Sequence, residues 1–462
     1  MRRKKWLSLC MAAALLAGCT AGCGDSGDKA GSNADADGGG GTEAPDAAGA
    51  SQEGDSDEIV TIKYVTWYNG EEELIEQFEK EHPNIKVDLT VVPDSGNTAE
   101  TLDVMAMGGG EIDVWPFQSG GQFARMQKGL LLDIGTYLDR DGIDMKDWFG
   151  DYEVWGQYNG NYYGLPSLAS VGMVFYNKDM FDEMNVPYPT EDWTIEDYYE
   201  IAGKLTKGSG GDKRYGTFTN PFVEEWGIYG CQVCPLYDEE GMCSFSADNE
   251  AFAKSLELRK RLDDSGYQLS YAQTNANWTL CGTEFLAERC AMTCGYSWMI
   301  QNMKDTESYP FDFENIGLCY FPRLSEDAPM KPSQVALEMI GIPASSKHPD
   351  EAWEFIKFYI QNGSMKSVAD GKVPAYQKLD KTELAKLLVE GTPLTVEQGA
   401  MFFEDDLHTY TAVPGGLAAG DYKTIIQEQT GMYFLGEQEL EETMTNIKEQ
   451  VDAAIRAEME AE

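Results

Sequence analysis

The order of apolar and polar residues in the first part of the folded region predicts alternating strands and helices. Residues 85–91 alternate between apolar and polar side chains, the period of a half-buried strand. Residues 59–65 form a β-branched run, and a helical spacing of apolar residues follows it and stops near His82. A short apolar run covers 112–115. Strands that alternate with helices in this way predict a parallel sheet covered by helices.

The same alternation continues to the end of the chain. We expect strands at 172–176 and 338–343, and helices that begin at Thr194 and at Pro349. A last amphipathic helix covers 440–455. The folded region, about 59–462, is too long for one compact core and therefore predicts two α/β lobes.

The N-terminus has the pattern of an export signal. A cationic start and a short apolar run lead to the small residues Ala17 and Gly18 before Cys19. This segment resembles a bacterial lipobox, which implies a signal peptide over 1–18 and lipidation of Cys19. A weaker copy of the pattern ends at Cys23, so the choice between the two cysteines stays open.

The segment 19–58 contains almost no large apolar side chain and is mostly Gly, Ala, Ser and acidic residues. Such a composition cannot form a core, so we expect a disordered acidic tether that spans roughly 35 Å. No later apolar run is long enough to cross a bilayer. The sequence therefore predicts a body held outside the cytoplasm by a lipid on the membrane.

Charge and histidine content exclude several classes of function. The formal net charge of the whole chain is −44, which argues strongly against binding to nucleic acid. The histidines, His82, His348 and His408, are far apart in sequence. We therefore expect no Ser-His-Asp enzyme, no metal site and no cofactor.

Cysteines of the folded region leave one motif unexplained. Cys231 and Cys234 form a Cys-x-x-Cys motif that could be redox-active or bind metal. Cys290 and Cys294 have the wrong spacing to complete a zinc ribbon with it. Buried thiols or a local disulfide are the expected state, and the pairing stays open. The remaining cysteines are Cys243, Cys281 and Cys319.

Short motifs follow one another through the folded region in the order of a known family. They are 159–166 (NGNYYGLP), 174–181 (VFYNKDMF), 189–194 (PTEDWT), 295–298 (GYSW), 341–356 and 372–375 (KVPA). Together they resemble the extracellular solute-binding proteins of sugar ABC transporters, the maltose-binding-like group. Two motifs depart from the family pattern, because Glu191 and Asp192 are inserted before Trp193 and the fourth motif is one residue longer.

The resemblance implies a two-lobed periplasmic-binding-protein-like fold of type II, with hinge crossovers and a ligand cleft between the lobes. Lobe one would hold 59–167 and 334–395, and lobe two 168–333 and 396–462. The implied partners are a sugar and the permease subunits of an ABC importer, and we expect a monomer.

Candidate ligand-binding residues combine hydrogen-bonding groups with flat aromatic faces, the two kinds of surface that a sugar needs. Trp67 follows the first strand, and Glu338 places a charge beside an apolar strand. The resemblance places Asp113, Trp115 and Trp298 against the ligand, whereas Trp193 and Trp353 are expected in the core. The full set of candidates is Trp67, Asp113, Trp115, Gln118, Tyr163, Tyr176, Trp278, Trp298 and Glu338.

A binding protein for a neutral mono- or oligosaccharide is the leading interpretation. A protein of the same fold could instead bind another small solute, such as a polyamine or a metal chelate. A secreted glycoside hydrolase is the alternative from another class, but no catalytic pair of carboxylates stands out. A sensor subunit for a membrane kinase also stays open.

Overall fold

The computed structural model describes residues 59–92, 104–105, 111–118, 122–221 and 229–461, except for the side chains of Gln118, Ser364 and Ala461. These residues belong to one compact unit, Asp57–Glu462. The predicted signal peptide, Cys19 and the tether lie outside the described residues.

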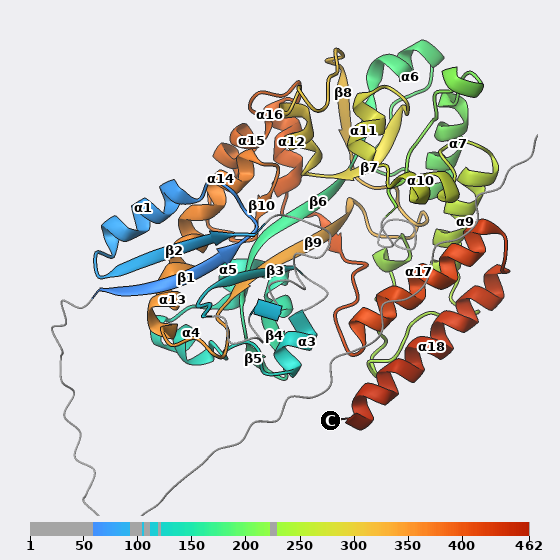
Figure 1. The fold of residues 1–462 in the computed structure, drawn as a ribbon. Coiled ribbons are helices and arrows are strands. Elements are labelled where there is room, and N and C mark those ends of the chain that lie inside the picture. The colour runs from blue at the N-terminus through green and yellow to red at the C-terminus, as the bar shows by residue number, and fades with distance from the viewer. Residues whose placement is uncertain (1–58, 93–103, 106–110, 119–121, 222–228, 462) are drawn as a thin grey trace, which may run out of the picture. The chain divides into compact units, whose positions relative to one another are not determined.

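The first strands and helix confirm the pattern predicted from the sequence (Figure 1). Strand β1 (Val60–Thr66) pairs in parallel with β2 (Ile85–Val91), and α1 (Glu72–Glu81) connects them. The third strand starts later than expected, since β3 covers Trp115–Gln118. Only Val114 bridges to β1 in parallel, because the chain then turns to pair antiparallel with β9 (Pro332–Gly341).

Strand β6 (Leu165–Asn177) joins two groups of strands, and all 13 of its residues are buried. Its first half pairs with β9 and with β10 (Val373–Pro374). Its second half pairs with β7 (Met292–Tyr296) and β8 (Ile316–Cys319). Figure 1 shows β6 and β9 running from the β1–β2 side of this unit toward the elements around β7.

Strands β6 and β9 both begin earlier than the predicted segments 172–176 and 338–343. Each strand contains a buried serine whose hydroxyl donates a hydrogen bond to a neighbouring strand. Ser167 Oγ donates to the carbonyl of Glu338 at 3.0 Å, and Ser333 Oγ donates to a β6 carbonyl at 2.9 Å. A buried hydroxyl with a partner costs little, so polar residues do not end the strands.

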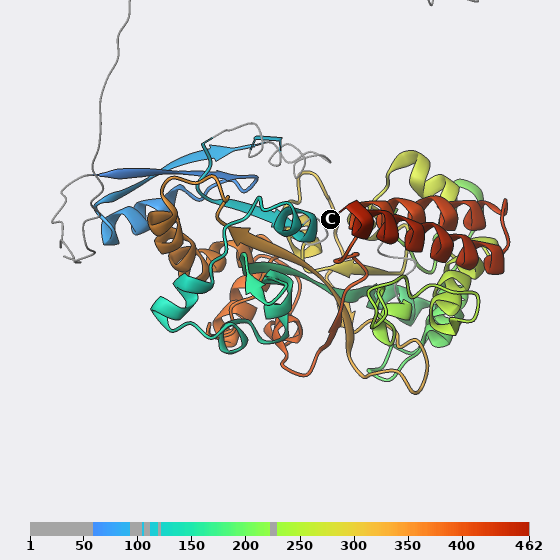
Figure 2. The same cartoon turned by 90° about the horizontal axis from the view of Figure 1, so that it is seen from below.

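Helices cover both groups of strands. The predicted helix at Thr194 is α7 (Ile195–Leu205), with Thr194 and Asp197 completing the capping box. The helix from Pro349 is α13 (Pro349–Phe358), and the last helix is α18 (Leu440–Ala461), which lies beside α17 (Ala419–Leu435) in both views (Figure 2).

Shorter elements complete the described part of the chain. The remaining α-helices are α3 (Gln122–Gln127), α4 (Gly135–Asp141), α5 (Met145–Phe149), α6 (Lys178–Met184), α9 (Glu250–Asp264), α10 (Tyr271–Asn277), α11 (Cys281–Leu286), α12 (Met299–Lys304), α14 (Ser364–Ala369), α15 (Lys381–Val389) and α16 (Val396–Ala400). The remaining strands are β4 (Gln157–Tyr158), β5 (Asn161–Tyr162) and β11 (His408–Tyr410). No helix in this part of the chain has the length and apolar character needed to cross a bilayer.

Two of the predicted lobe boundaries fall inside long strands, and the third falls between two helices that pack together. The boundary at 167/168 lies inside β6 and the one at 333/334 inside β9, so continuous strands would cross between lobes. After the boundary at 395/396, α16 still packs against α15. The division into lobes at these residues stays a prediction.

Candidate ligand-binding site

Glu338 stands in the middle of β9 and is the centre of a buried polar network. In register, it lies opposite Leu168 of β6 on one side and Gln118 of β3 on the other. Lys372 Nζ donates to Glu338 Oε1 at 2.7 Å, and the hydroxyl of Tyr68 donates to Oε2. The side chain of Glu338 is 6% exposed, so this charge is held by partners and not by bulk water.

The partners of Glu338 come from two turns that are distant in sequence. Tyr68 follows β1, and Lys372 stands directly before β10. Lys372 Nζ also contacts Ser170 Oγ of β6 at 3.3 Å. A carboxylate taken out of water needs such compensation, because an unpaired buried charge is strongly unfavourable. We refer to Tyr68, Ser170, Glu338 and Lys372 below as the Glu338 network.

Aromatic residues pack next to the Glu338 network. Trp67 and Trp115 belong to one apolar cluster that also contains Met339, the residue after Glu338. Trp115 is 1% exposed, and its indole N–H has no acceptor among the described residues. The guanidinium of Arg125 lies 5.9 Å from the Trp115 ring centroid. Trp67 reaches the Glu338 network through Tyr68, with 5.6 Å between their ring centroids, whereas Trp115 faces the opposite side of the β3–β9 pair from Glu338.

Asp113 precedes β3, and both of its carboxylate oxygens accept hydrogen bonds from the protein. The backbone N–H of Lys63 donates to Oδ2 at 2.8 Å, and Ser346 Oγ donates to Oδ1 at 2.6 Å. These bonds tie β1 to the turn before α13. They give Asp113 a structural task that its sequence context did not reveal.

Tyr163 lies against the Trp67–Trp115 cluster, and Gln118 lies opposite Glu338 on the neighbouring strand. Tyr163 is half-buried, packs against the Trp67–Trp115 cluster and stands just before β6. The backbone of Gln118 pairs with Glu338, but its side chain lies outside the described part of the structure.

Trp298 approaches the Glu338 network through the turn that carries Lys372. Gly371 has φ +81°, and a Cβ there would lie 2.9 Å from the Cα of Trp298 and 2.6 Å from the carbonyl of Ser297. The backbone before Lys372 therefore packs directly on the start of α12. The Trp298 ring is half-buried and stacks on Tyr296, with 6.3 Å between ring centroids.

Tyr176 and Trp278 are not brought into this group. Tyr176 lies eight residues beyond Leu168 along β6, about 26 Å away. Its ring packs with Phe181 at 5.1 Å, and burial raises its pKa to about 12. Trp278 ends α10 with φ +46° and is 55% exposed. Tyr176 thus has the surroundings of a core residue, and the ligand role of Trp278 stays a prediction.

Sequence analysis missed Tyr68, Ser170 and Lys372 as site candidates. Two of them lay within segments already marked as informative, the turn after the first strand and the motif 372–375. Neither segment indicates that its polar side chain meets Glu338, because partner choice depends on how β1, β6, β9 and β10 align.

No disulfide joins the cysteines of the described body, and all of them but Cys234 are buried. Among the residues that the structure describes, no group of three or more His, Cys, Asp or Glu side chains is placed to hold a metal ion.

Together, the polar and aromatic groups can bind a polar ligand that has apolar faces. Glu338 offers carboxylate lone pairs, Tyr68 and Lys372 offer donors, and Trp298 offers a partly open ring. The arrangement supports binding of a solute.

Known proteins resemble this chain over most of its length. Residues 66–366 match the family of bacterial extracellular solute-binding proteins. A multiple sugar-binding protein from Streptococcus mutans is 25% identical over 342 residues, which cover 67% of this chain and 73% of that protein.

Solved structures agree with the predicted fold. A sugar transporter protein from Rhizobium etli in an open conformation superposes with a TM-score of 0.72 at 22% identity, covering 86% of this chain and 100% of that one. An ABC substrate-binding protein from Listeria monocytogenes in complex with cycloalternan has a TM-score of 0.69 at 20% identity, covering 86% of this chain and 99% of that one. They confirm the two-lobed α/β fold of type II. With the match over 66–366, this chain belongs to the bacterial extracellular solute-binding proteins.

Proposed function

We propose that the protein binds a neutral mono- or oligosaccharide and delivers it to an ABC importer. The observation that carries this proposal is the buried Glu338 carboxylate, whose partner Tyr68 packs against the ring of Trp67 and whose partner Lys372 follows Gly371, the residue that packs on the backbone of the half-buried Trp298. Carboxylate oxygens accept hydrogen bonds from sugar hydroxyls, and indole rings pack on sugar C–H faces. The names of relatives that bind multiple sugars and cycloalternan support the same class of ligand.

Delivery would use the two lobes and the permease of the importer. The lobes would close on the sugar by a hinge at β6 and β9, and the closed form would dock on the permease as a monomer. The same closed form could serve a sensor kinase, and the gene neighbourhood would show which membrane partner is present.

A thermal-shift screen over a sugar library tests the proposed ligand class. A ligand that binds only the folded protein raises the midpoint by mass action, so the cognate sugar should give a shift that grows with concentration. Calorimetry should then give a one-to-one complex. If no neutral sugar changes the midpoint but a polyamine or a metal chelate raises it, that solute and not a sugar is the ligand.

Incubation with the bound oligosaccharide separates this proposal from a glycoside hydrolase. A binding protein returns the oligosaccharide intact, whereas a hydrolase yields shorter products. Shorter products whose appearance depends on the protein would overturn the binding role.

We further propose that Cys19 carries a lipid that holds the protein on the outer face of the cell membrane. Cys19→Ser should release the protein from the membrane fraction and abolish metabolic lipid labelling. Cys23→Ser is the matched control and should change neither. Release by Cys23→Ser and not by Cys19→Ser would move the anchor to Cys23.

A further inference from the structure

The Cys-x-x-Cys motif lies on a tight turn that the proposed sugar site does not use. The 3₁₀ helix Tyr229–Gln232 contains Cys231, and the N–H groups of Val233 and Cys234 both donate to the carbonyl of Gly230, at 3.1 and 3.0 Å. In such a turn, side chains three residues apart lie on the same side. Burial, and after it the nearby sulfur of Cys234, raise the pKa of Cys231. The two sulfurs are therefore neighbours.

The two thiols differ in access and in hydrogen bonding. Cys234 is half-exposed, whereas Cys231 is 7% exposed. Asn249 Nδ2 donates to Cys234 Sγ at 3.4 Å. Asn249 is held in place because its Oδ1 accepts the N–H of Ala251 at 3.1 Å. Cys234 Sγ also donates to the carbonyl of Pro235 at 3.6 Å. Reactive cysteines are at least partly accessible, whereas buried ones are inert. Cys234 is thus the sulfur that a reagent reaches first.

The residue between the two cysteines fixes the turn to other segments. Gln232 Nε2 donates to the carbonyl of Pro322 at 2.9 Å, and Gln232 Oε1 accepts the N–H of Leu324 at 2.9 Å. The Gln232 carbonyl contacts His408 Nε2 at 2.8 Å. These bonds keep the turn in place while a bond forms between the sulfurs beside it.

We propose that Cys231 and Cys234 are a reversible thiol–disulfide pair. Proteins of this family work outside the cytoplasm, where disulfides form and persist. The oxidant is a low-molecular-weight or protein disulfide. The Cys234 thiolate attacks one sulfur of that disulfide, whose S–S bond breaks and releases one thiolate. Cys231 then loses its proton to solvent and attacks Cys234 Sγ, which releases the second thiolate. The protein loses two hydrogens, and the oxidant gains them as two thiols.

Glutathione disulfide is the probe for a test with the full chain. After exposure, free thiols are blocked by alkylation and peptides are analysed by mass spectrometry. The wild-type chain should show a disulfide within the peptide that contains Cys231 and Cys234, and dithiothreitol should reverse it. Cys231→Ser should retain glutathione on Cys234, because the second step is lost. Cys234→Ser should carry no glutathione at Cys231, which is buried.

Cys319→Ser is the matched control, since Cys319 is a buried thiol of β8 outside the Cys-x-x-Cys motif and the variant should behave as wild type. A wild-type chain that keeps all its thiols reduced overturns the proposal, as does one that keeps glutathione on Cys234 without forming the internal disulfide. The wild-type result decides the question by itself if a variant fails to fold. The outcome is independent of sugar binding.

Discussion

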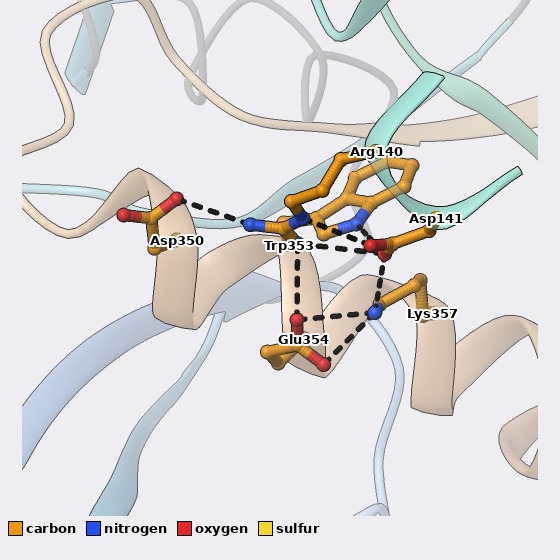
Figure 3. A network of polar contacts seen from close by, with 6 residues as sticks. All are labelled: Arg140, Asp141, Asp350, Trp353, Glu354 and Lys357. Carbon is orange, nitrogen blue, oxygen red and sulfur yellow. Dashed lines mark hydrogen bonds and ion pairs between the residues drawn. The ribbon is translucent and has the colours of Figure 1, made fainter. Parts of the chain in front are cut away.

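Two polar networks in the same unit hold charged side chains in opposite ways. The first joins α4 to α13 and consists of Arg140, Asp141, Asp350, Glu354 and Lys357, with the indole of Trp353 (Figure 3). The second is the Glu338 network. In the first, Asp350 is 73% exposed and Arg140 45% exposed. In the second, Glu338 is 6% exposed.

Asp141 shows how the α4–α13 network shares its charges. Its carboxylate accepts from Arg140 Nε at 2.8 Å, from Lys357 Nζ at 2.6 Å and from the Trp353 indole at 2.8 Å. Arg140 first, and then Lys357 and Trp353, hold the pKa of Asp141 well below its usual range. If one of these donors is removed, the Asp141 carboxylate keeps the other donors, and water can take the vacant position.

The Glu338 carboxylate has fewer hydrogen-bond donors around it than the Asp141 carboxylate, so the loss of one donor is harder to replace. Lys372 is the cationic partner of Glu338 among the described residues, and Tyr68 supplies a neutral donor. The comparison teaches that the number of ion pairs does not measure their importance. Exposed pairs contribute little each, whereas a buried charge depends on each partner.

Replacement of Lys372 should give the largest effect. Lys372→Met leaves the Glu338 carboxylate buried without its cation, so the free energy of unfolding should fall by about 3–5 kcal/mol in a denaturant titration. Lys357→Met is the matched control, because both lysine side chains are 20% exposed. Its cost should be about 1 kcal/mol or less. Equal losses for the two variants would erase the distinction between the networks.

The double variant Lys372→Met with Glu338→Gln sharpens this test. It removes both charges and should recover much of the stability lost in Lys372→Met alone, since no unpaired charge remains. A double variant as unstable as the single one would mean that packing, and not charge, explains the loss.

Glu338→Gln alone should weaken ligand binding. A hydrogen bond to a charged group contributes about 1.5–3 kcal/mol, so the Kd for the cognate sugar should rise roughly 10- to 150-fold in calorimetry. Glu354→Gln changes the same functional group in the α4–α13 network and should leave the Kd unchanged. An unaltered Kd in Glu338→Gln would remove Glu338 from the site.

Trp298→Ala should separate a ligand-facing ring from a core ring. A half-buried ring that stacks on a sugar should cost on the order of 1–3 kcal/mol of binding free energy, by analogy with other ring ligands, and little stability. Trp353, which is fully buried, is the control: Trp353→Ala should cost roughly 3–5 kcal/mol of unfolding free energy and leave affinity intact. Unchanged affinity with a large drop in midpoint would place Trp298 in the core.

The smallest effect should come from Asp141, and it should depend on pH. Because its folded pKa is lowered, its stabilisation is present above the unfolded pKa of about 3.9 and is lost as the pH falls through the folded value. Solvent screening limits the loss in Asp141→Asn to about 1 kcal/mol at neutral pH. The difference from wild type should shrink below about pH 4 and in high salt. A difference that stays constant from neutral to strongly acidic pH would contradict the ion-pair explanation.

Local sequence patterns determined much of the fold. The parallel pair β1–β2, the capping box of α7 and the buried face of α18 followed from apolar period and helix-start signals. Such patterns act over a few residues, so they survive in the structure without knowledge of distant partners. The ordered motifs likewise identified the family, because they were spread over most of the folded chain.

Tertiary structure alone decided how the candidate side chains are used. Glu338 meets Lys372 across 34 residues and Tyr68 across 270, and Asp113 turns both oxygens to protein donors. Tyr176, one strand length from Glu338, is buried in another part of the core. These outcomes depend on strand register and on which turns converge, and register sets which side of a strand each residue faces. The sequence therefore determined the elements and the residue types available for binding, whereas the alignment of β6 and β9 with their neighbours decided which of them meet.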